Sequence, residues 1–228
     1  MKKYIALVLC IMFLLIGCTM EVEAFSEPTN SDISYDWEIV KFHTETTEGY
    51  VRYGAVVKVV NTGDVNIKLG YWKLDIEDAD GHLVYTIDSS NNFSAPSIIK
   101  PGETGYYFTL SMDEFNSTDS TEYKLVPHFD YMSATKEEPK EFAVEDVSFK
   151  QSEEDFPTVL GRVINDTDKG HTYGVYAIFY DGNGDIISIS GTLDEVGAND
   201  KSSFMIEDYK AFGRADIANY EVKAFLYD

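Results

Sequence analysis

Apolar and polar residues alternate along several stretches of this chain, and this period of two constrains its fold more than any other feature. The apolar members of three such stretches are Tyr53, Ala55, Val57 and Val59; Trp72, Leu74 and Ile76; and Tyr106, Phe108, Leu110 and Met112. Successive side chains of a strand point to opposite faces, so alternation predicts antiparallel strands with one face on a core. We therefore expect an all-β protein.

The same landmarks occur twice, in the same order, which predicts an internal repeat. The matched segments are 57–62 and 161–166, 74–81 and 177–184, 101–103 and 196–198, and 123–126 and 220–223. Asp80-Gly81 and Asn183-Gly184 favour tight turns, because such turns require positive φ angles. Short strands in a repeat of about 95–104 residues predict two tandem immunoglobulin-like antiparallel β-sandwiches. We expect them at residues 35–131 and 141–228, with a polar linker at 132–140 and Trp72 in the first core.

The first residues of the chain predict where the protein resides. Lys2 and Lys3 precede an apolar run at 4–16, which is too short to span a membrane and has the length of a secretory signal. The run ends in Leu15-Ile16-Gly17-Cys18, which resembles the lipobox of bacterial lipoproteins. That resemblance implies a signal peptide at 1–17, a lipid on Cys18 and an extracytoplasmic location on the bacterial cell membrane or envelope. The polar residues that follow, which show little apolar periodicity, predict a flexible tether at 18–34. The alternatives are an ordinary signal peptide with an incidental cysteine and an uncleaved anchor.

Composition excludes two other classes of protein. The chain has 18 Lys and Arg against 40 Asp and Glu, a net charge of −22. Because affinity for phosphate depends on Lys and Arg, nucleic acid is not expected as a partner. Two cysteines are too few for a multi-disulfide scaffold or a four-thiolate zinc site.

The repeated turn residues resemble those of FxLYD-type and related immunoglobulin-like domains of bacterial surface lipoproteins. The matching residues are Asn61-Thr62, Asp78, Asp80-Gly81 and the segment 99–103 in the first half, and Asn165, Tyr180-Asp181 and Gly184 in the second. The resemblance implies the fold and a surface location, with no shared catalytic residues and no cofactor. The literal Phe225-Leu226-Tyr227-Asp228 lies in the last strand, where the motif does not belong, and is interpreted as coincidental.

No enzyme motif is present, and we expect a non-catalytic protein. The sequence contains no P-loop, G-x-S-x-G elbow or H-E-x-x-H motif. The strongest metal candidate is the calcium-loop-like set Asp181, Asn183 and Asp185, which departs from an EF-hand at its sixth and twelfth positions. Turn preference alone explains the same residues, so no metal site is predicted.

A candidate interaction face lies in the second half, at Tyr176, Ile178 and Tyr180. The alternate residues Val175, Ala177 and Phe179 are also apolar, so both faces of this strand are apolar. A large apolar face favours a contact surface. The alternatives are a ligand face and packing against the first domain, the linker or the segment near Tyr209, of which packing is favoured.

These inferences together predict a lipid-anchored binding or accessory module of the cell envelope. Its expected partners are the membrane, through the anchor, and an unidentified envelope protein or ligand. The alternatives are a lipoprotein that binds a solute or Ca²⁺ and, third, a hydrolase acting in the envelope.

Overall fold

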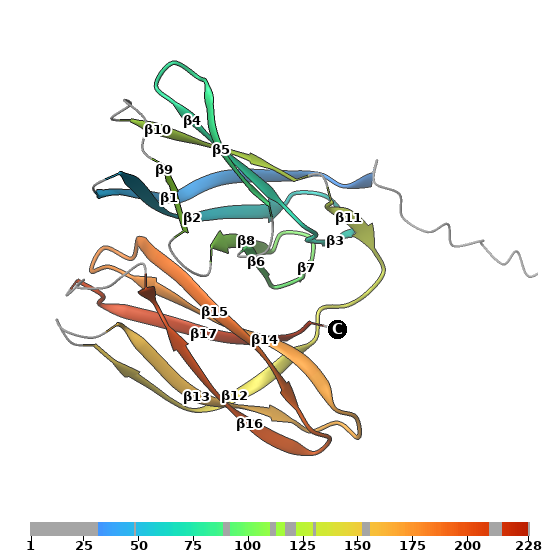
Figure 1. Ribbon diagram of the computed structural model, residues 1–228. Helices are drawn as coiled ribbons and strands as arrows, with labels where there is room; N and C mark the ends of the chain where they lie inside the picture. Colours follow the sequence, from blue (N-terminus) through green and yellow to red (C-terminus); the bar gives the residue numbers. More distant parts are fainter. Residues whose placement is uncertain are drawn as a thin grey trace, which may run out of the picture.

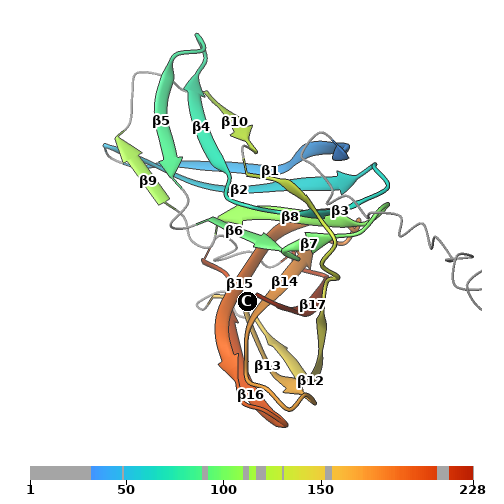
Figure 2. The ribbon, with the colours of Figure 1, turned by 90° about the vertical axis from the view of Figure 1, so that its right-hand side faces the viewer.

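The protein folds into two β-sandwiches that are stacked on each other, so that four layers of sheet follow one another (Figures 1 and 2). The computed structural model describes residues 32–47, 49–88, 92–109, 113–116, 122–129, 131–151, 156–209 and 216–227. The predicted signal peptide, Cys18 and all but the last residues of the predicted tether lie outside these ranges. Among the described residues, no helix is long and apolar enough to cross a membrane.

The first sandwich contains the strands β1 to β11. They are β1 (Tyr35–Thr47), β2 (Tyr50–Asn61), β3 (Asn66–Lys68), β4 (Lys73–Asp78), β5 (Leu83–Asp88), β6 (Asn92–Ala95), β7 (Ile98–Ile99), β8 (Thr104–Thr109), β9 (Asp113–Asn116), β10 (Tyr123–His128) and β11 (Ser133–Thr135). One sheet has the order β1-β2-β8-β6, with β9 also paired to β2. Its order corresponds to the ABED sheet of an immunoglobulin sandwich. The sheets β10-β4-β5 and β11-β3-β7 supply the opposite layer.

Alternating residues of β2 line the first core, as the sequence predicts. Tyr53 and Val57 are fully buried, together with Trp72, whose ring stacks on Tyr107 at a centroid distance of 5.0 Å. The prediction that Phe108 of β8 faces this core is wrong. Tyr107 enters the core instead, and Phe108 points to the opposite side of the sheet. Both faces of β8 are apolar, so alternation alone does not tell which face lies inside. Leu110 and Met112 lie outside the described residues.

The second sandwich contains β12 (Glu141–Lys150), β13 (Thr158–Asn165), β14 (His171–Tyr180), β15 (Ile186–Val196), β16 (Asp200–Glu207) and β17 (Asn219–Leu226). They follow the order β15-β14-β17-β12-β13-β16. Strand β12 pairs first with β17 and then with β13. A register shift between Glu145 and Ser148, with Asp146 at φ 54°, bends β12 from one layer to the other. The predicted all-β fold of two tandem immunoglobulin-like sandwiches is confirmed.

The segment expected as a linker, 132–140, is more ordered than its composition suggests. Its residues Ser133–Thr135 form β11, which pairs with β3 of the first sandwich. This is a correction to the predicted boundary, and its cause is tertiary: a three-residue strand exists only because a partner strand supplies its hydrogen bonds. Residues 136–140 lead from β11 of the first sandwich to β12 of the second.

Candidate functional site at the junction of the sandwiches

The predicted interaction face of β14 is buried at the junction of the two sandwiches. Tyr176 and Ile178 are each only 2% exposed, and Tyr180 is half-buried beside them. The opposite face of β14, with Val175, belongs to the second sandwich's own core. A ligand face at Tyr176 and Ile178 is therefore wrong, and packing against the first domain is what the structure shows. Both faces of β14 are apolar because each contacts a different core.

A third apolar cluster, here called the junction core, joins the outer faces of two sheets. Its buried members are Val56, Phe93, Ala95 and Phe108 of the first sandwich, and Tyr176, Ile178, Ile189 and Phe225 of the second. The ring of Tyr176 stacks on Phe225 at 5.8 Å and meets Phe108 at 6.4 Å. Burial of each large apolar side chain contributes about 1.5–3 kcal/mol. The junction core therefore couples the two sandwiches.

One glycine of the second sandwich, Gly174, makes room for this approach. A Cβ added at Gly174 would lie 3.1 Å from Cζ of Phe93, and one at Gly191 would lie 3.5 Å from Cζ of Phe108. At Gly191 the added Cβ would also lie 2.9 Å from the carbonyl oxygen of Val175. Glycine lets a backbone approach its neighbour closely. Gly174 thus lets the two sheets come close at Phe93, whereas Gly191 is required by the Val175 carbonyl of its own sheet.

Polar side chains border the junction core where β17 meets β14. The hydroxyl of Tyr180 donates a hydrogen bond to Oε2 of Glu221 at 3.2 Å, and Lys223 forms an ion pair with the same carboxylate at 2.9 Å. Burial, followed by the charge of Glu221, raises the pKa of Tyr180 to about 12. Within the first sandwich, Lys58 of β2 forms an ion pair with Glu38 of β1 at 2.8 Å. The hydrogen bond and both ion pairs shield this edge of the junction core with polar groups.

A cavity of about 230 Å³ opens beside this border and is lined by both sandwiches. Its wall contains Pro96, Ile98, Glu103, Thr104, Tyr106, Pro139, Glu141, Tyr176, Ile178, Glu221, Lys223 and Phe225. Three carboxylates, one lysine and two tyrosines therefore belong to this wall. Burial is the main cause that raises the pKa of Tyr106 and of Tyr176, so both hydroxyls stay protonated at neutral pH.

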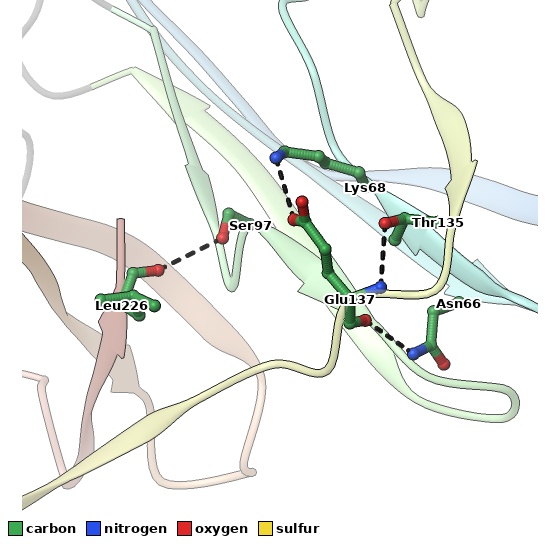
Figure 3. A network of polar contacts seen from close by, with 6 residues as sticks. All are labelled: Asn66, Lys68, Ser97, Thr135, Glu137 and Leu226. Carbon is green, nitrogen blue, oxygen red and sulfur yellow. Dashed lines mark hydrogen bonds and ion pairs between the residues drawn. The ribbon is translucent and has the colours of Figure 1, made fainter. Parts of the chain in front are cut away.

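The last residues of the chain contribute to the junction, which the sequence analysis missed. Phe225 belongs to the junction core, and the ring of Tyr227 stacks on Phe93 at 5.7 Å with an interplanar angle of 10°. The hydroxyl of Ser97 donates to the carbonyl oxygen of Leu226 at 3.4 Å (Figure 3). Residues 225–227, which carry the first three letters of the literal motif, thus make structural contacts between the two sandwiches.

The crossing segment is held against the first sandwich near this contact. Asn66 donates through Nδ2 to the carbonyl oxygen of Glu137 at 2.9 Å, and Lys68 forms an ion pair with the Glu137 carboxylate at 3.1 Å (Figure 3). The hydroxyl oxygen of Thr135 accepts a hydrogen bond from the Glu137 backbone N–H at 3.1 Å. The ion pair of Lys100 with Glu138 lies one residue further on. These bonds restrict the segment that connects the two sandwiches.

The predicted calcium-like set forms a turn stabilised within the chain. Oδ1 of Asp181 accepts hydrogen bonds from the backbone N–H groups of Asn183 and Asp185 at 2.8 and 3.0 Å. These bonds lower the pKa of Asp181, that from Asp185 most. Gly184 has the φ angle of 88° that the turn requires. These hydrogen bonds are the ones that a turn at Asp181, Asn183 and Asp185 requires.

The corresponding turn of the first sandwich has the same geometry, and it also brings together three side chains of the types that bind metal ions. Oδ1 of Asp78 accepts from the N–H groups of Asp80 and His82 at 3.0 and 2.9 Å, with Gly81 at φ 82°. Side-chain atoms of Asp78, Asp80 and His82 lie within 4.8 Å of one another. The hydrogen bonds between Asp78 and the backbone explain this arrangement, and we assign no metal to the three residues.

A second hollow, here called the distal hollow, lies at the end of the first sandwich where β1 turns into β2. Its volume is about 560 Å³, and its wall contains Tyr50, Asp78, Leu83, Val84, Tyr85, Glu114, Phe115 and Asn116. Leu83 is 61% exposed, while the ring of Tyr85 stacks on Phe115 at 5.5 Å. The opposite end of β1 is where the chain enters, and there the Ser34 carbonyl accepts from the N–H groups of Thr62 and Gly63.

Comparisons with known proteins give no family for this chain. No protein-family model and no curated protein matches it. Among solved structures it is similar to a Bacteroides uniformis β-glucuronidase, with 11% identity, a TM-score of 0.24 and coverage of 75% of this chain and 27% of that one. It is also similar to a calcium-binding mutant of Bacteroides uniformis β-glucuronidase 2, with 14% identity, a TM-score of 0.25 and coverage of 74% and 23%.

A third similar structure is a β-glucuronidase from glycoside hydrolase family 2, with 10% identity, a TM-score of 0.23 and coverage of 91% of this chain and 22% of that one. The chain thus spans about a quarter of the length of these enzymes. Likenesses this weak carry no argument about activity.

Proposed function

We propose that this protein is a non-catalytic binding or accessory module of the bacterial cell envelope, anchored by a lipid on Cys18. In this proposal the two sandwiches act as one body. The distal hollow, exposed at the end of the first sandwich away from the tether, contacts another envelope protein.

The proposal rests on exposed apolar side chains that lie at the end of the first sandwich opposite to Ser34, where the chain enters β1. Tyr50, Leu83 and Tyr85 are 47%, 61% and 37% exposed around the distal hollow. Strand β1 has 13 residues, and strands rise about 3.3 Å per residue, so β1 separates the hollow from the tether by about 40 Å. Tyrosine is enriched at protein contacts, because it joins apolar area to a hydroxyl group, and the exposed Leu83 adds further apolar area to this surface.

The anchor supplies the other half of the proposal. Two or more acyl chains hold a protein stably at a membrane, whereas one chain binds reversibly. A tether of about 16 residues reaches on the order of 20–25 Å on average. The two sandwiches therefore stay near the membrane. When β1 is perpendicular to the membrane plane, the distal hollow points away from the membrane.

Two measurements test this proposal. Cys18→Ala is expected to move the protein from the membrane fraction to the soluble fraction, and unchanged membrane fractionation would contradict anchoring. Photo-crosslinkers placed at Leu83 in living cells are expected to capture a defined envelope protein. The matched control is Tyr131, which is 58% exposed but lies away from the distal hollow. Equal capture of the same protein from both positions, or none from Leu83, would contradict the proposed surface.

A further inference from the structure

Strand β5 has an unpaired edge that borders the distal hollow. Within the part of the chain that the structure describes, β5 pairs with β4 alone, and Figure 2 shows it at the outside of the sheet β10-β4-β5. Leu83, Val84 and Tyr85 of this strand line the hollow. An edge strand presents backbone N–H and C=O groups with which a further strand can pair. The hollow therefore lies beside a row of backbone groups that can bind an extended chain.

The sequence of β5 lacks the features that commonly prevent such pairing. Its six residues, Leu83–Asp88, contain no proline, lysine or arginine. Its register with β4 shifts only near its first residues and is regular from Tyr85 onward. The opposite edge of the same sheet is β10, which carries Lys124 and Pro127, and both residue types hinder the addition of a strand. Of these two edges, β5 is thus the one suited to pair with another chain.

An apolar floor beside this edge is partly uncovered. The ring of Tyr85 stacks on Phe115 of β9 at 5.5 Å, with an interplanar angle of 17°. Leu83 and Tyr50 are exposed in the same wall. Side chains of alternate residues lie on one face of a strand, so a strand added to β5 would direct every second side chain over this floor. Backbone pairing and apolar contact are therefore available at the same place.

The charges of the distal hollow decide which kind of chain fits it. Its described lining residues include two carboxylates, Asp78 and Glu114, and no lysine or arginine. Glu114 forms an ion pair with Arg52 at 3.6 Å, but both side chains are more than half exposed, so this pair is weak. Backbone hydrogen bonds, that from His82 most, lower the pKa of Asp78, which is therefore ionised at neutral pH. The hollow thus complements a segment that carries a lysine or an arginine.

We propose that an extended segment of another envelope protein adds to the edge of β5 as a further strand. An apolar side chain of this segment covers Leu83 and Tyr85, and a lysine or arginine two residues away pairs with Glu114. Backbone pairing supplies affinity in such an arrangement, and the alternate side chains supply specificity. This inference rests on the proposed function, because the distal hollow is the surface assigned to a partner there, and it adds how that partner is bound.

Synthetic peptides test this mode of binding. The probe is acetyl-Ser-Val-Thr-Phe-Thr-Lys-Thr-amide, in which the valine, phenylalanine and lysine share one face of a strand, and its control has glutamate in place of the lysine. Two further versions carry N-methyl groups on the amides of either the odd or the even residues. Because alternate N–H groups of a strand point to opposite edges, only one of these two sets can face β5. Isothermal titration calorimetry measures binding to the full-length protein in neutral detergent.

The expected result is saturable binding of the probe that depends on one edge of the peptide and on its lysine. The glutamate control should bind about fivefold more weakly or worse, and one N-methylated version alone should lose about tenfold or more. Hydrogen–deuterium exchange should slow at alternate amides of β5 when the probe is bound. Absence of probe binding, equal binding of the glutamate control, or the same effect of both N-methylated versions would overturn the proposal.

Two variants and a matched control locate the site. Leu83→Lys places a positive charge beside the lysine of the probe and should weaken its binding about tenfold. Met205→Lys, at a similarly exposed position on β16, should leave binding unchanged, and melting temperatures verify that both variants fold. Glu114→Gln should reduce the preference for the probe over its glutamate control. Unchanged binding by Leu83→Lys, or an unchanged preference in Glu114→Gln, would also overturn the proposal.

These results separate the inference from the proposed function. Capture of an envelope protein from Leu83 in cells, together with any of the contrary peptide results, overturns strand addition and leaves the proposed function intact. Failure of that capture, together with the expected peptide results, contradicts the proposed partner while β5 stays a strand-binding edge.

Discussion

Asn61 and Asn165 occupy equivalent positions in the two sandwiches and make the same hydrogen bonds. Nδ2 of Asn61 donates to the carbonyl oxygens of Val65 and Ile99 at 2.8 and 3.1 Å. Nδ2 of Asn165 donates to those of Lys169 and Gly197 at 2.6 and 2.8 Å. Each asparagine thus ties the turn after its strand to the segment that leads into β8 or β16.

Replacement of either asparagine by aspartate is expected to destabilise the protein strongly. Both side chains are at most 1% exposed, so Asn61→Asp or Asn165→Asp leaves two carbonyl oxygens unpaired and buries a charge. An uncompensated buried charge costs about 3–5 kcal/mol. Chemical denaturation measures the loss, and Asn219→Asp, on an exposed position, is the control. Equal stability of Asn61→Asp and Asn219→Asp would show that these bonds do not matter.

Gly174→Val is expected to separate the sandwiches while leaving their own cores intact. The added side chain would meet Phe93 across the junction, and overpacking of this kind costs about 1–3 kcal/mol. Calorimetry should then show two unfolding transitions where the unaltered protein shows one. Gly182→Ala, at a position with no atom within 4 Å of the added Cβ, is the control. A single transition at unchanged temperature for Gly174→Val would contradict the role of the junction.

Acid should weaken the turn at Asp181. Backbone hydrogen bonds lower the pKa of this carboxyl in the folded protein below its ordinary value of 3.8. A lowered folded-state pKa stabilises the fold above pH 3.8, and this contribution disappears as the pH falls through the folded-state value. Asp181→Asn keeps an acceptor oxygen but cannot titrate.

The melting temperature between pH 7 and pH 3 checks this expectation. Asp181→Asn should lose less stability on acidification than the unaltered protein, and Asp181→Ala should already be less stable at pH 7, because it lacks the acceptor. An identical pH dependence of all three proteins would rule out this contribution.

The crossing segment should resist proteolysis because it is bonded to the first sandwich. Asn66→Ala removes the hydrogen bond to the Glu137 carbonyl and is expected to increase the rate of tryptic cleavage after Lys136 or Lys140. Mass spectrometry of the first fragments identifies the cleavage site. Rapid cleavage at these lysines in the unaltered protein would mean that the segment is a free linker.

The sequence predicts those features that depend on neighbouring residues. The alternation of Tyr53 and Val57, the core position of Trp72 and the turns at Asp80-Gly81 and Asn183-Gly184 all follow from strand periodicity or turn chemistry. These patterns are local, so one sequence suffices to find them.

The junction could not be predicted in the same way, because it depends on which two surfaces meet. Alternation marks Tyr176 as facing away from Phe179, but it does not identify Phe108 as the partner of Tyr176. Alternation also does not distinguish the two apolar faces of β8. Phe108 is therefore expected in the first core, where Tyr107 lies in the structure. Strand β11 could not be predicted from the sequence for the same reason, because it is a strand only through its pairing with β3.

The central claim, that the junction core makes one rigid body of two sandwiches, is tested most directly by a distance measurement between them. The fragment 19–228 contains no cysteine, so Lys124→Cys on β10 and Met205→Cys on β16 can be spin-labelled selectively. Pulsed electron–electron double resonance should give one narrow distance distribution, which broadens when Phe93→Ala and Phe108→Ala remove two rings of the junction core. A broad distribution in the fragment that retains Phe93 and Phe108 would contradict the claim.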